Sequence, residues 1–145
     1  MTKIQVTKLN SGAIIPTRGS NAAAGMDLYA CTTGSVVIMP HETVMIGTGL
    51  AIELPDNTFG AIVARSGLAS KQGLAPANKI GIVDSDYRGE CKVALHNHSN
   101  EPQTINSMER IAQLIVIPYI PFEFVEVDGL SETERGAGGF GSTGK

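Results

Sequence analysis

The sequence predicts an all-β domain, of the sandwich, jelly-roll or barrel kind, with one short helix. Short apolar runs recur along most of the chain, and residues that favour turns, such as Gly, Pro, Asn and Asp, separate them. Only one stretch has helical character. Many short strands with almost no helix are typical of these all-β architectures.

The expected strands follow one another at short intervals, and a loop at 10–21 that is rich in Gly, Pro and Asn separates the first strand from the others. They are residues 4–6, 36–38, 44–46, 50–54, 61–64, 80–83, 91–97, 111–117 and 122–127. Alternation of apolar and polar residues indicates the strands at 4–6 and 91–97. Residues 111–117 are nearly all apolar, which predicts burial on both faces. Residues 66–72 are the helix candidate, and Gly73 is expected to end it.

Composition indicates one globular domain. The chain has 145 residues, 42% hydrophobic and 17% charged, with a net charge of −3. This charge argues against a protein that grips a nucleic-acid backbone, and the low charged fraction suggests surface hidden against a partner or other copies. No apolar run approaches the ~18 residues of a membrane span. We expect no signal peptide, because Met1, Thr2 and Lys3 lead directly into alternating polar and apolar residues. Cys31 and Cys91 have neither disulfide-framework nor metal-site spacing, so we expect a reducing, cytoplasmic location.

The chain divides at its C-terminal end. Residues 128–135 read as an exposed linker, and residues 135–145 contain five glycines and cannot pack a core of their own. The sequence therefore predicts a folded domain at 1–134 and an arm at 135–145. The arm is either disordered or a nucleotide contact, since Arg135, Phe140, Ser142 and Thr143 offer a cation, a stacking face and hydroxyl donors.

The stretch 81–90, GIVDSDYRGE, is the most distinctive acidic segment. Asp84 and Asp86 would share one face of an extended backbone at the end of an apolar strand. A carboxylate in that position suits a general base or a metal contact. A plain turn between two strands explains the same residues equally well.

Three further clusters carry weaker signals. Arg65 and Ser66 open the helix candidate, so its amides and the Ser66 hydroxyl could face an anion, although Ser66 is as readily an N-cap. Asp27 stands among small residues, where structural use is the simpler interpretation. Arg110 and Gln113 lie at the start of the strand at 111–117. His96 and His98 share a strand face, and we expect a solvated pair rather than a metal site.

Five stretches, in this order, resemble the trimeric deoxyuridine triphosphatase (dUTP pyrophosphatase, dUTPase) family. They are AAGMDLYA at 23–30, ARSGLA at 64–69, GIVDSDYRGE at 81–90, ERIAQL at 109–114 and RGAGGFGSTG at 135–144. Departures are mild: Met26 stands where an aromatic residue is frequent, and Ser107, Met108 and Glu109 precede Arg110 in place of a more usual Gly-Asp. None of these removes a residue with a chemical role.

The resemblance implies a distorted β jelly roll with a flexible glycine-rich arm, assembled as a homotrimer with shared active sites. The implied reaction is hydrolysis of dUTP to dUMP and pyrophosphate, with Mg²⁺ on the triphosphate. By the same match, Asp84 activates the attacking water, and Asp27 contacts the Mg²⁺ shell through water. No nucleic acid or membrane is an expected partner.

The resemblance also assigns the substrate contacts. The candidates for phosphate binding are Arg65, Ser66, Gly67, Arg110, Gln113, Arg135, Gly141, Ser142 and Thr143. Arg65 and Arg110 could instead pair with Asp27. Uracil would bind the backbone of the hairpin containing Asn78, Gly81, Ile82 and Val83. Tyr87 would pack against deoxyribose, and Phe140 would stack over the base.

Two alternatives stay open at this point. The related deoxycytidine triphosphate deaminases share the fold, but they need an additional glutamate over the base, for which the sequence offers no obvious candidate. The second alternative is a trimeric binding module that uses nucleotide as a switch. Asp84 is present, which favours catalysis over a purely binding role.

Overall fold

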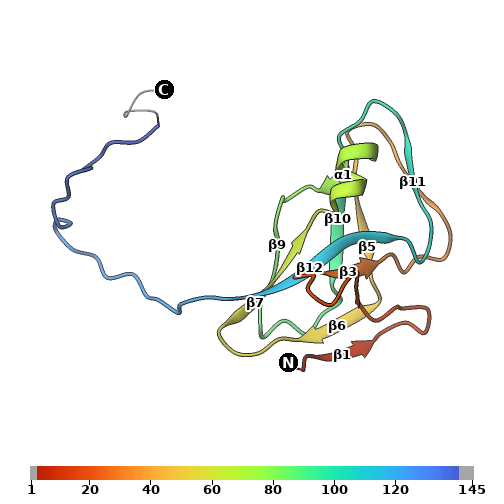
Figure 1. Ribbon diagram of the computed structural model, residues 1–145, viewed down its shortest axis with the longest axis horizontal. Helices are drawn as coiled ribbons and strands as arrows, with labels where there is room; N and C mark the ends of the chain where they lie inside the picture. The colour runs from red at the N-terminus through yellow and green to blue at the C-terminus, as the bar shows by residue number, and fades with distance from the viewer. Residues whose placement is uncertain (1–2, 141–145) are drawn as a thin grey trace.

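The computed structural model describes residues 3–140 of the chain (Figure 1). In chain order its elements are β1 (Gln5–Lys8), β2 (Thr17–Arg18), β3 (Met26–Tyr29), β4 (Val36–Ile38), β5 (Thr43–Gly47), β6 (Leu50–Glu53), β7 (Thr58–Val63), α1 (Ser66–Gln72), β8 (Leu74–Pro76), β9 (Gly81–Val83), β10 (Lys92–Asn97), β11 (Gln103–Ile105) and β12 (Arg110–Pro118). The prediction of an all-β fold with one short helix is confirmed.

The strands form antiparallel sheets around one core. The largest sheet has the order β2-β3-β12-β7-β9, and β12 lies at its centre. Smaller sheets have the orders β5-β10-β8, β1-β6 and β4-β11. Buried side chains from all four sheets meet in one cluster that includes Leu28, Ile38, Ile46, Ile52 and Leu95.

The central strand β12 is less buried than its composition predicted. Ile111, Ala112 and Leu114 are buried, whereas residues 115–117 are half-buried. The strand is covered on both faces only in its first half, because its C-terminal half runs toward the edge of the body and then leaves it (Figure 1).

The helix has the predicted bounds, but its N-cap residue differs from the one expected. Arg65, not Ser66, is the N-cap residue, in an extended conformation (φ −84°, ψ 129°) and without a side-chain cap. Ser66 is already helical, so the interpretation of Ser66 as an N-cap is wrong. Gly73 ends the helix with a left-handed φ of 66°, as expected of a C-terminal glycine.

The strand predicted at 122–127 is absent from the described chain. Instead, the segment after Pro118 runs away from the body (Figure 1), and Phe122, Phe124 and Val125 are 77%, 94% and 73% exposed. The segment is rich in apolar residues, but a strand needs a neighbouring strand, and none is available to this segment within the described part of one chain. Pro118 and Pro121 also lack the N–H groups that would continue the ladder of β12.

Strands β2, β3, β8 and β11 were not predicted. Each spans four residues or fewer and none contains a run of large apolar residues, so their pairing depends on neighbours that are distant in sequence. Among residues 3–140, no helix has the length and apolar character needed to cross a membrane.

Candidate functional site

Asp27 on β3 holds two arginines from distant parts of the chain. Its Oδ1 accepts a hydrogen bond from Arg65 Nε at 2.8 Å, and its Oδ2 accepts one from Arg110 Nη1 at 3.3 Å. The Asp27 side chain is only 13% exposed. Charge-assisted hydrogen bonds of this kind fix the planes of both guanidinium groups. Both arginines therefore pair with Asp27, while their contact with phosphate stays a prediction.

Sheet register brings these side chains together. Across the largest sheet, Asp27 on β3 pairs with Gln113 on β12, and Gln113 pairs with Val63 on β7. The register shifts between Arg110 and Ala112, and such a bulge re-aims the side chain next to it. Arg110 thereby reaches the carboxylate of Asp27.

The side chain of Gln113 links β12 to the start of the helix. Its Nε2 donates a hydrogen bond to the carbonyl of Ala64 at 3.0 Å. A Cβ on Gly25 would lie 2.5 Å from Gln113 Oε1, so only glycine leaves room for this amide. Sequence reasoning assigned no role to Gly25.

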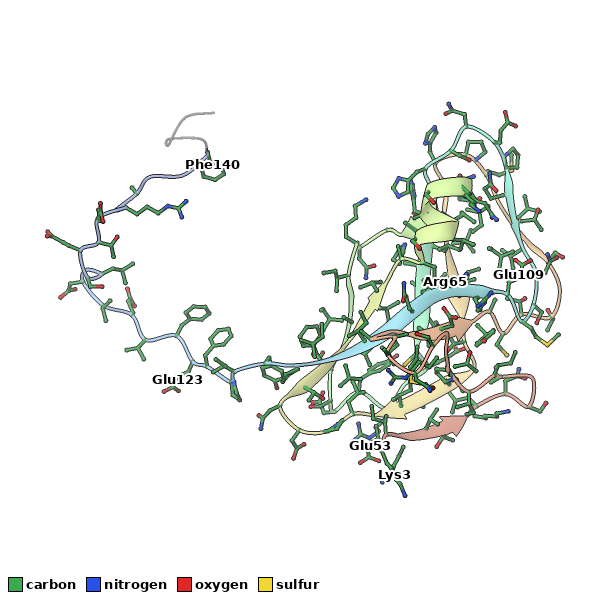
Figure 2. All side chains as sticks on the ribbon, viewed as in Figure 1. Lys3, Glu53, Arg65, Glu109, Glu123 and Phe140 are labelled. Atoms are coloured by element: carbon green, nitrogen blue, oxygen red, sulfur yellow. The ribbon has the colours of Figure 1, made fainter. Side chains whose placement is uncertain are left out.

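The start of α1 completes this group. Ser66 and Gly67 are exposed, and a Cβ on Gly67 would meet nothing within 4 Å. Their amides lie in the first turn, where backbone N–H groups lack partners within the helix. Arg65 lies just below α1 in Figure 2. We call Asp27, Arg65, Ser66, Gly67, Arg110 and Gln113 the arginine cluster, and its two cations and free amides suit an anionic ligand.

A second group lies at the opposite edge of the largest sheet, on β9. A Cβ on Gly81 would lie 3.3 Å from the Cβ of Ile62, and one on Gly60 would lie 3.3 Å from the Cβ of Val83. Such close approach is typical of the narrow, non-hydrogen-bonded pairs of an antiparallel ladder. The amide and carbonyl groups of Gly81 and Val83 therefore point away from β7, toward the free edge of the sheet.

The turn before β9 is tight but is not the expected hairpin. Strand β8 pairs with β10, whereas β9 pairs with β7, so the two strands flanking the turn belong to different sheets. Lys79 has a φ of 63°, and its amide donates to the carbonyl of Pro76 at 3.0 Å. The side chain of Asn78 lies against Gly81, where a Cβ would be 3.2 Å from Asn78 Nδ2.

The chain turns directly after β9. The amide of Tyr87 donates to the carbonyl of Asp84 at 3.1 Å, and the Asp84 side chain is exposed. The expectation that Asp84 and Asp86 share a strand face is wrong, because the backbone leaves the extended conformation at Ser85. The turn interpretation is correct locally, and it leaves Asp84 free to act on a ligand. We call residues 78–87 the β9 loop.

One chain does not bring the arginine cluster and Asp84 together. Val83 pairs with Gly60, so Asp84 lies beside Phe59 at the beginning of β7, whereas Arg65 follows the end of β7. Arg65 comes six positions after Phe59, which is about 20 Å along a strand. A ligand that contacts both groups directly within one chain would have to span that distance.

The C-terminal candidates are also separate from both groups. Phe140 lies far from Arg65 in Figure 2 and is fully exposed. Arg135 Nε donates to the carbonyl of Gly138 at 2.8 Å, so its contact is local. Gly141, Ser142 and Thr143 lie outside the described residues.

The histidines and cysteines do not add a catalytic group. The rings of His96 and His98 meet edge to face at 4.4 Å, and His96 Nδ1 lies 2.8 Å from Thr43 Oγ1. Desolvation, followed by the nearby His96, lowers the pKa of His98. Burial, followed by the charge of Glu90, raises the pKa of Cys91 to about 11, which keeps this thiol protonated at neutral pH. Within residues 3–140, no group of three or more His, Cys, Asp or Glu side chains could hold a metal ion.

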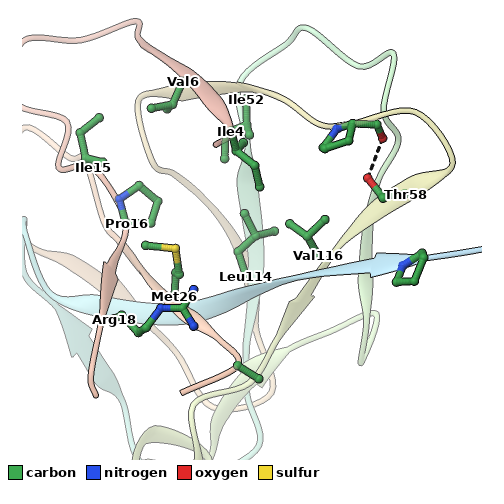
Figure 3. A pocket seen from close by; sticks show the side chains of 13 residues that line it. Ile4, Val6, Ile15, Pro16, Arg18, Met26, Ile52, Thr58, Leu114 and Val116 are labelled. Carbon is green, nitrogen blue, oxygen red and sulfur yellow. Dashed lines mark hydrogen bonds between the residues drawn. The ribbon is translucent and has the colours of Figure 1, made fainter. Parts of the chain in front are cut away.

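A pocket of about 540 Å³ lies elsewhere, between β1, β6 and β12 (Figure 3). Its lining is mostly apolar and includes Ile4, Val6, Met26, Ile52 and Leu114, with Arg18 at one side. The lining has no carboxylate, so the pocket offers no general base. It is separate from the acidic β9 loop.

Comparison with known proteins relates the whole chain to one family. A family model described as dUTPase matches residues 11–144. The deoxyuridine 5'-triphosphate nucleotidohydrolase of Nautilia profundicola is 51% identical over 99% of both chains, and that of Neisseria meningitidis is 45% identical over 90% of this chain and 88% of its own. A solved structure of the Staphylococcus bacteriophage 80alpha dUTPase with dUPNHPP superimposes with a TM-score of 0.87, at 28% identity and full coverage of both chains.

Proposed function

This chain belongs to the dUTPase family and hydrolyses dUTP to dUMP and pyrophosphate, and we propose that it does so at a site shared between copies of the chain. The observation that carries the shared site is the separation of Asp84 from the arginine cluster by about 20 Å of strand. A base and its phosphate clamp must both reach one triphosphate. A symmetric assembly, here a homotrimer, brings the β9 loop of one copy to the arginine cluster of another.

Asp84 is the proposed base. Its carboxylate is exposed at the end of β9, and the hydrogen bond from the Tyr87 amide to its carbonyl holds the backbone that carries it. It would orient the attacking water and take its proton as the water approaches the α-phosphorus. The arginine cluster would bind the triphosphate from the other side.

The residues fit a Mg²⁺ ion that arrives with the nucleotide. Mg²⁺ keeps several waters and needs only one or two carboxylates besides substrate phosphates. Both oxygens of Asp27 are engaged by arginine, so Asp27 suits contact through water rather than direct coordination. When bound, the ion neutralises charge on the triphosphate and on the leaving pyrophosphate.

Uracil selection is proposed to reside at the free edge of β9. The outward amide and carbonyl groups of Gly81 and Val83, with the side chain of Asn78, match the alternating acceptor and donor pattern of uracil O2, N3–H and O4. Ile82, between them, would contribute its backbone and shape to the same edge. The arm would close the site, with Phe140 over the base and Arg135, Gly141, Ser142 and Thr143 on the phosphates.

The exposed segment at 122–127 supports assembly. Phe122, Phe124 and Val125 expose apolar surface that a single chain leaves in water. Another copy that covers this segment would supply the neighbouring strand it lacks.

Measuring products from dUTP, dCTP, dTTP and UTP tests the substrate assignment. Cytosine has an acceptor at N3 and an amino donor at position 4, the reverse of uracil, so neither group can pair with the β9 edge. Each unpaired buried group costs roughly 1–3 kcal/mol. We therefore expect dUMP from dUTP and a kcat/KM for dCTP that is at least about tenfold lower. Formation of dUTP from dCTP would instead indicate deamination. Binding of dUTP without turnover would indicate a nucleotide-switched binding module.

Mixing two inactive variants tests the shared site. Asp84→Asn lacks the base and Arg110→Ala lacks one clamp arginine, so each alone should be nearly inactive. If the two residues act from different copies, random co-assembly restores both to about a quarter of the sites. Differently tagged chains should be co-expressed and the mixed trimers isolated, in which one site of the three then carries both residues. Activity that stays at the level of the separate variants would show that Asp84 and Arg110 act from the same copy.

A further inference from the structure

Position 89 is occupied by glycine because there is no room for a side chain, and not because of the backbone conformation. A Cβ on Gly89 would lie 2.4 Å from Tyr87 Oη, 2.5 Å from Cζ and 2.9 Å from Cε2. Gly89 is not among the residues with positive φ, so the backbone there accepts an L side chain without strain. The three atoms nearest to that Cβ position all belong to the Tyr87 side chain.

The hydroxyl of Tyr87 is anchored to the core through Glu90. Tyr87 Oη donates to the carbonyl of Glu90 at 3.1 Å. The Glu90 carboxylate in turn accepts from the Gly49 amide at 2.8 Å and lies 3.4 Å from Lys92 Nζ. The next amide, that of Cys91, donates to the carbonyl of Leu50 at 2.8 Å. The ring therefore rests on a backbone that is fixed to the connection between β5 and β6.

The other end of the turn is braced by Arg88. Its Nη1 donates to the carbonyl of Ser85 at 2.6 Å, and its Nη2 lies 3.4 Å from Glu53 Oε1 on β6. Since the Tyr87 amide also bonds to the Asp84 carbonyl, the ring and the base belong to one braced turn. Tyr87 as a whole remains 45% exposed.

We propose that Gly89 is a positioning residue that sets the sugar selectivity of the enzyme through Tyr87. The inference rests on the proposed function and on the contact between the Tyr87 ring and deoxyribose that the family resemblance implies. A ring packed against the sugar leaves no room for a 2′-hydroxyl. Carbon atoms in contact are normally 3.5–4.0 Å apart, so a methyl group on residue 89 moves the ring by about 1 Å or more. The displaced ring no longer forms a close wall beside C2′ of the sugar.

A double-mutant cycle tests this inference. Measure kcat/KM for dUTP and UTP in the wild type, Gly89→Ala, Tyr87→Ala and the double variant. We expect Tyr87→Ala and Gly89→Ala each to lower the dUTP/UTP ratio by about tenfold or more, because each removes the wall. In the Tyr87→Ala background, Gly89→Ala should have no further effect on the ratio, since Gly89 acts only through the ring.

The controls separate failure of this inference from failure of the proposed function. If Tyr87→Ala leaves the kcat/KM ratio unchanged while dUTP is still hydrolysed, Tyr87 does not read the sugar and this inference fails, whereas a wild type without dUTP turnover overturns the proposed function. If Tyr87→Ala lowers the dUTP/UTP ratio but Gly89→Ala does not, the role of Gly89 is overturned and the proposed function stands. The same conclusion follows if Gly89→Ala still changes the ratio in the Tyr87→Ala background. Gly34→Ala is the matched glycine control, because a Cβ there meets nothing within 4 Å. If Gly89→Ala fails to fold, Tyr87→Phe is the deciding variant, because it removes the hydroxyl but keeps the ring packed on Gly89. A dUTP/UTP ratio that falls as far as in Tyr87→Ala would then contradict the inference.

Discussion

Replacement of Asp84 by Asn is expected to lower turnover of dUTP by roughly 10²–10⁴-fold, the usual contribution of a positioned general base. The amide has nearly the shape of the carboxylate but cannot accept the proton of the attacking water. Because Asp84 is exposed and its backbone rather than its side chain braces the turn, folding, trimer assembly and dUTP binding should persist. Single-turnover rates and binding of a non-hydrolysable dUTP analogue measure the two effects separately.

Asp86→Asn is the matched control for this prediction. It removes the same charge from the same exposed turn, two residues away, and should leave turnover within a few-fold of the wild type. Near-normal turnover in Asp84→Asn together with a large loss in Asp86→Asn would transfer the role of base to Asp86.

The accuracy of the sequence predictions depended on how local each feature is. Helix α1 was predicted with its observed bounds, since the residues that form it and Gly73, which ends it, are adjacent in the chain. Strand β10 was predicted because its apolar residues alternate over six positions. By contrast, β3 and β8 are short, and they are strands because β12 and β10 pair with them. No local pattern contains that information.

In the candidate site, too, features set by adjacent residues were predicted and contacts between distant residues were not. The family-like stretches identified Asp27, Arg65 and Arg110 as chemically relevant, but their pairing joins positions 38 and 83 residues apart. That contact follows from sheet register and from a bulge in β12, neither of which the sequence displays. Gly89 could have been noticed from its place two residues after a tyrosine, yet only the coordinates show that the Tyr87 ring occupies its side-chain volume.

The failed strand at 122–127 has a different physical cause. Its apolar residues led to the strand prediction, and its exposed phenylalanines show that these side chains are uncovered in one chain. A sequence indicates that an apolar segment must be buried, but it does not indicate which molecule buries it. The proposed assembly, a functional unit larger than one chain, accounts for both this segment and the separated clusters.

Ending the chain after Glu134 is expected to reduce turnover by more than about a hundredfold, because loss of even one well-placed donor to a developing charge has an effect of that size. The truncation removes Arg135, Phe140, Gly141, Ser142 and Thr143 together. The melting temperature and the mass in solution should not change, because the described contacts of Arg135 are local to the segment and Phe140 is fully exposed. Measuring all three quantities on one preparation distinguishes a missing lid from a damaged fold.

Co-assembly extends this test to the origin of the arm. Truncated chains retain Asp84, and Asp84→Asn chains retain the arm, so a site restored in mixed trimers must take its base from one copy and its arm from another. As with the first pair of variants, random mixing restores about a quarter of the sites if the two contributions come from different copies. If the arm instead closes over the Asp84 of its own copy, no mixed site is complete and the activity stays at the level of the separate variants. A truncated enzyme with full activity would show that residues 135–145 take no part in the reaction.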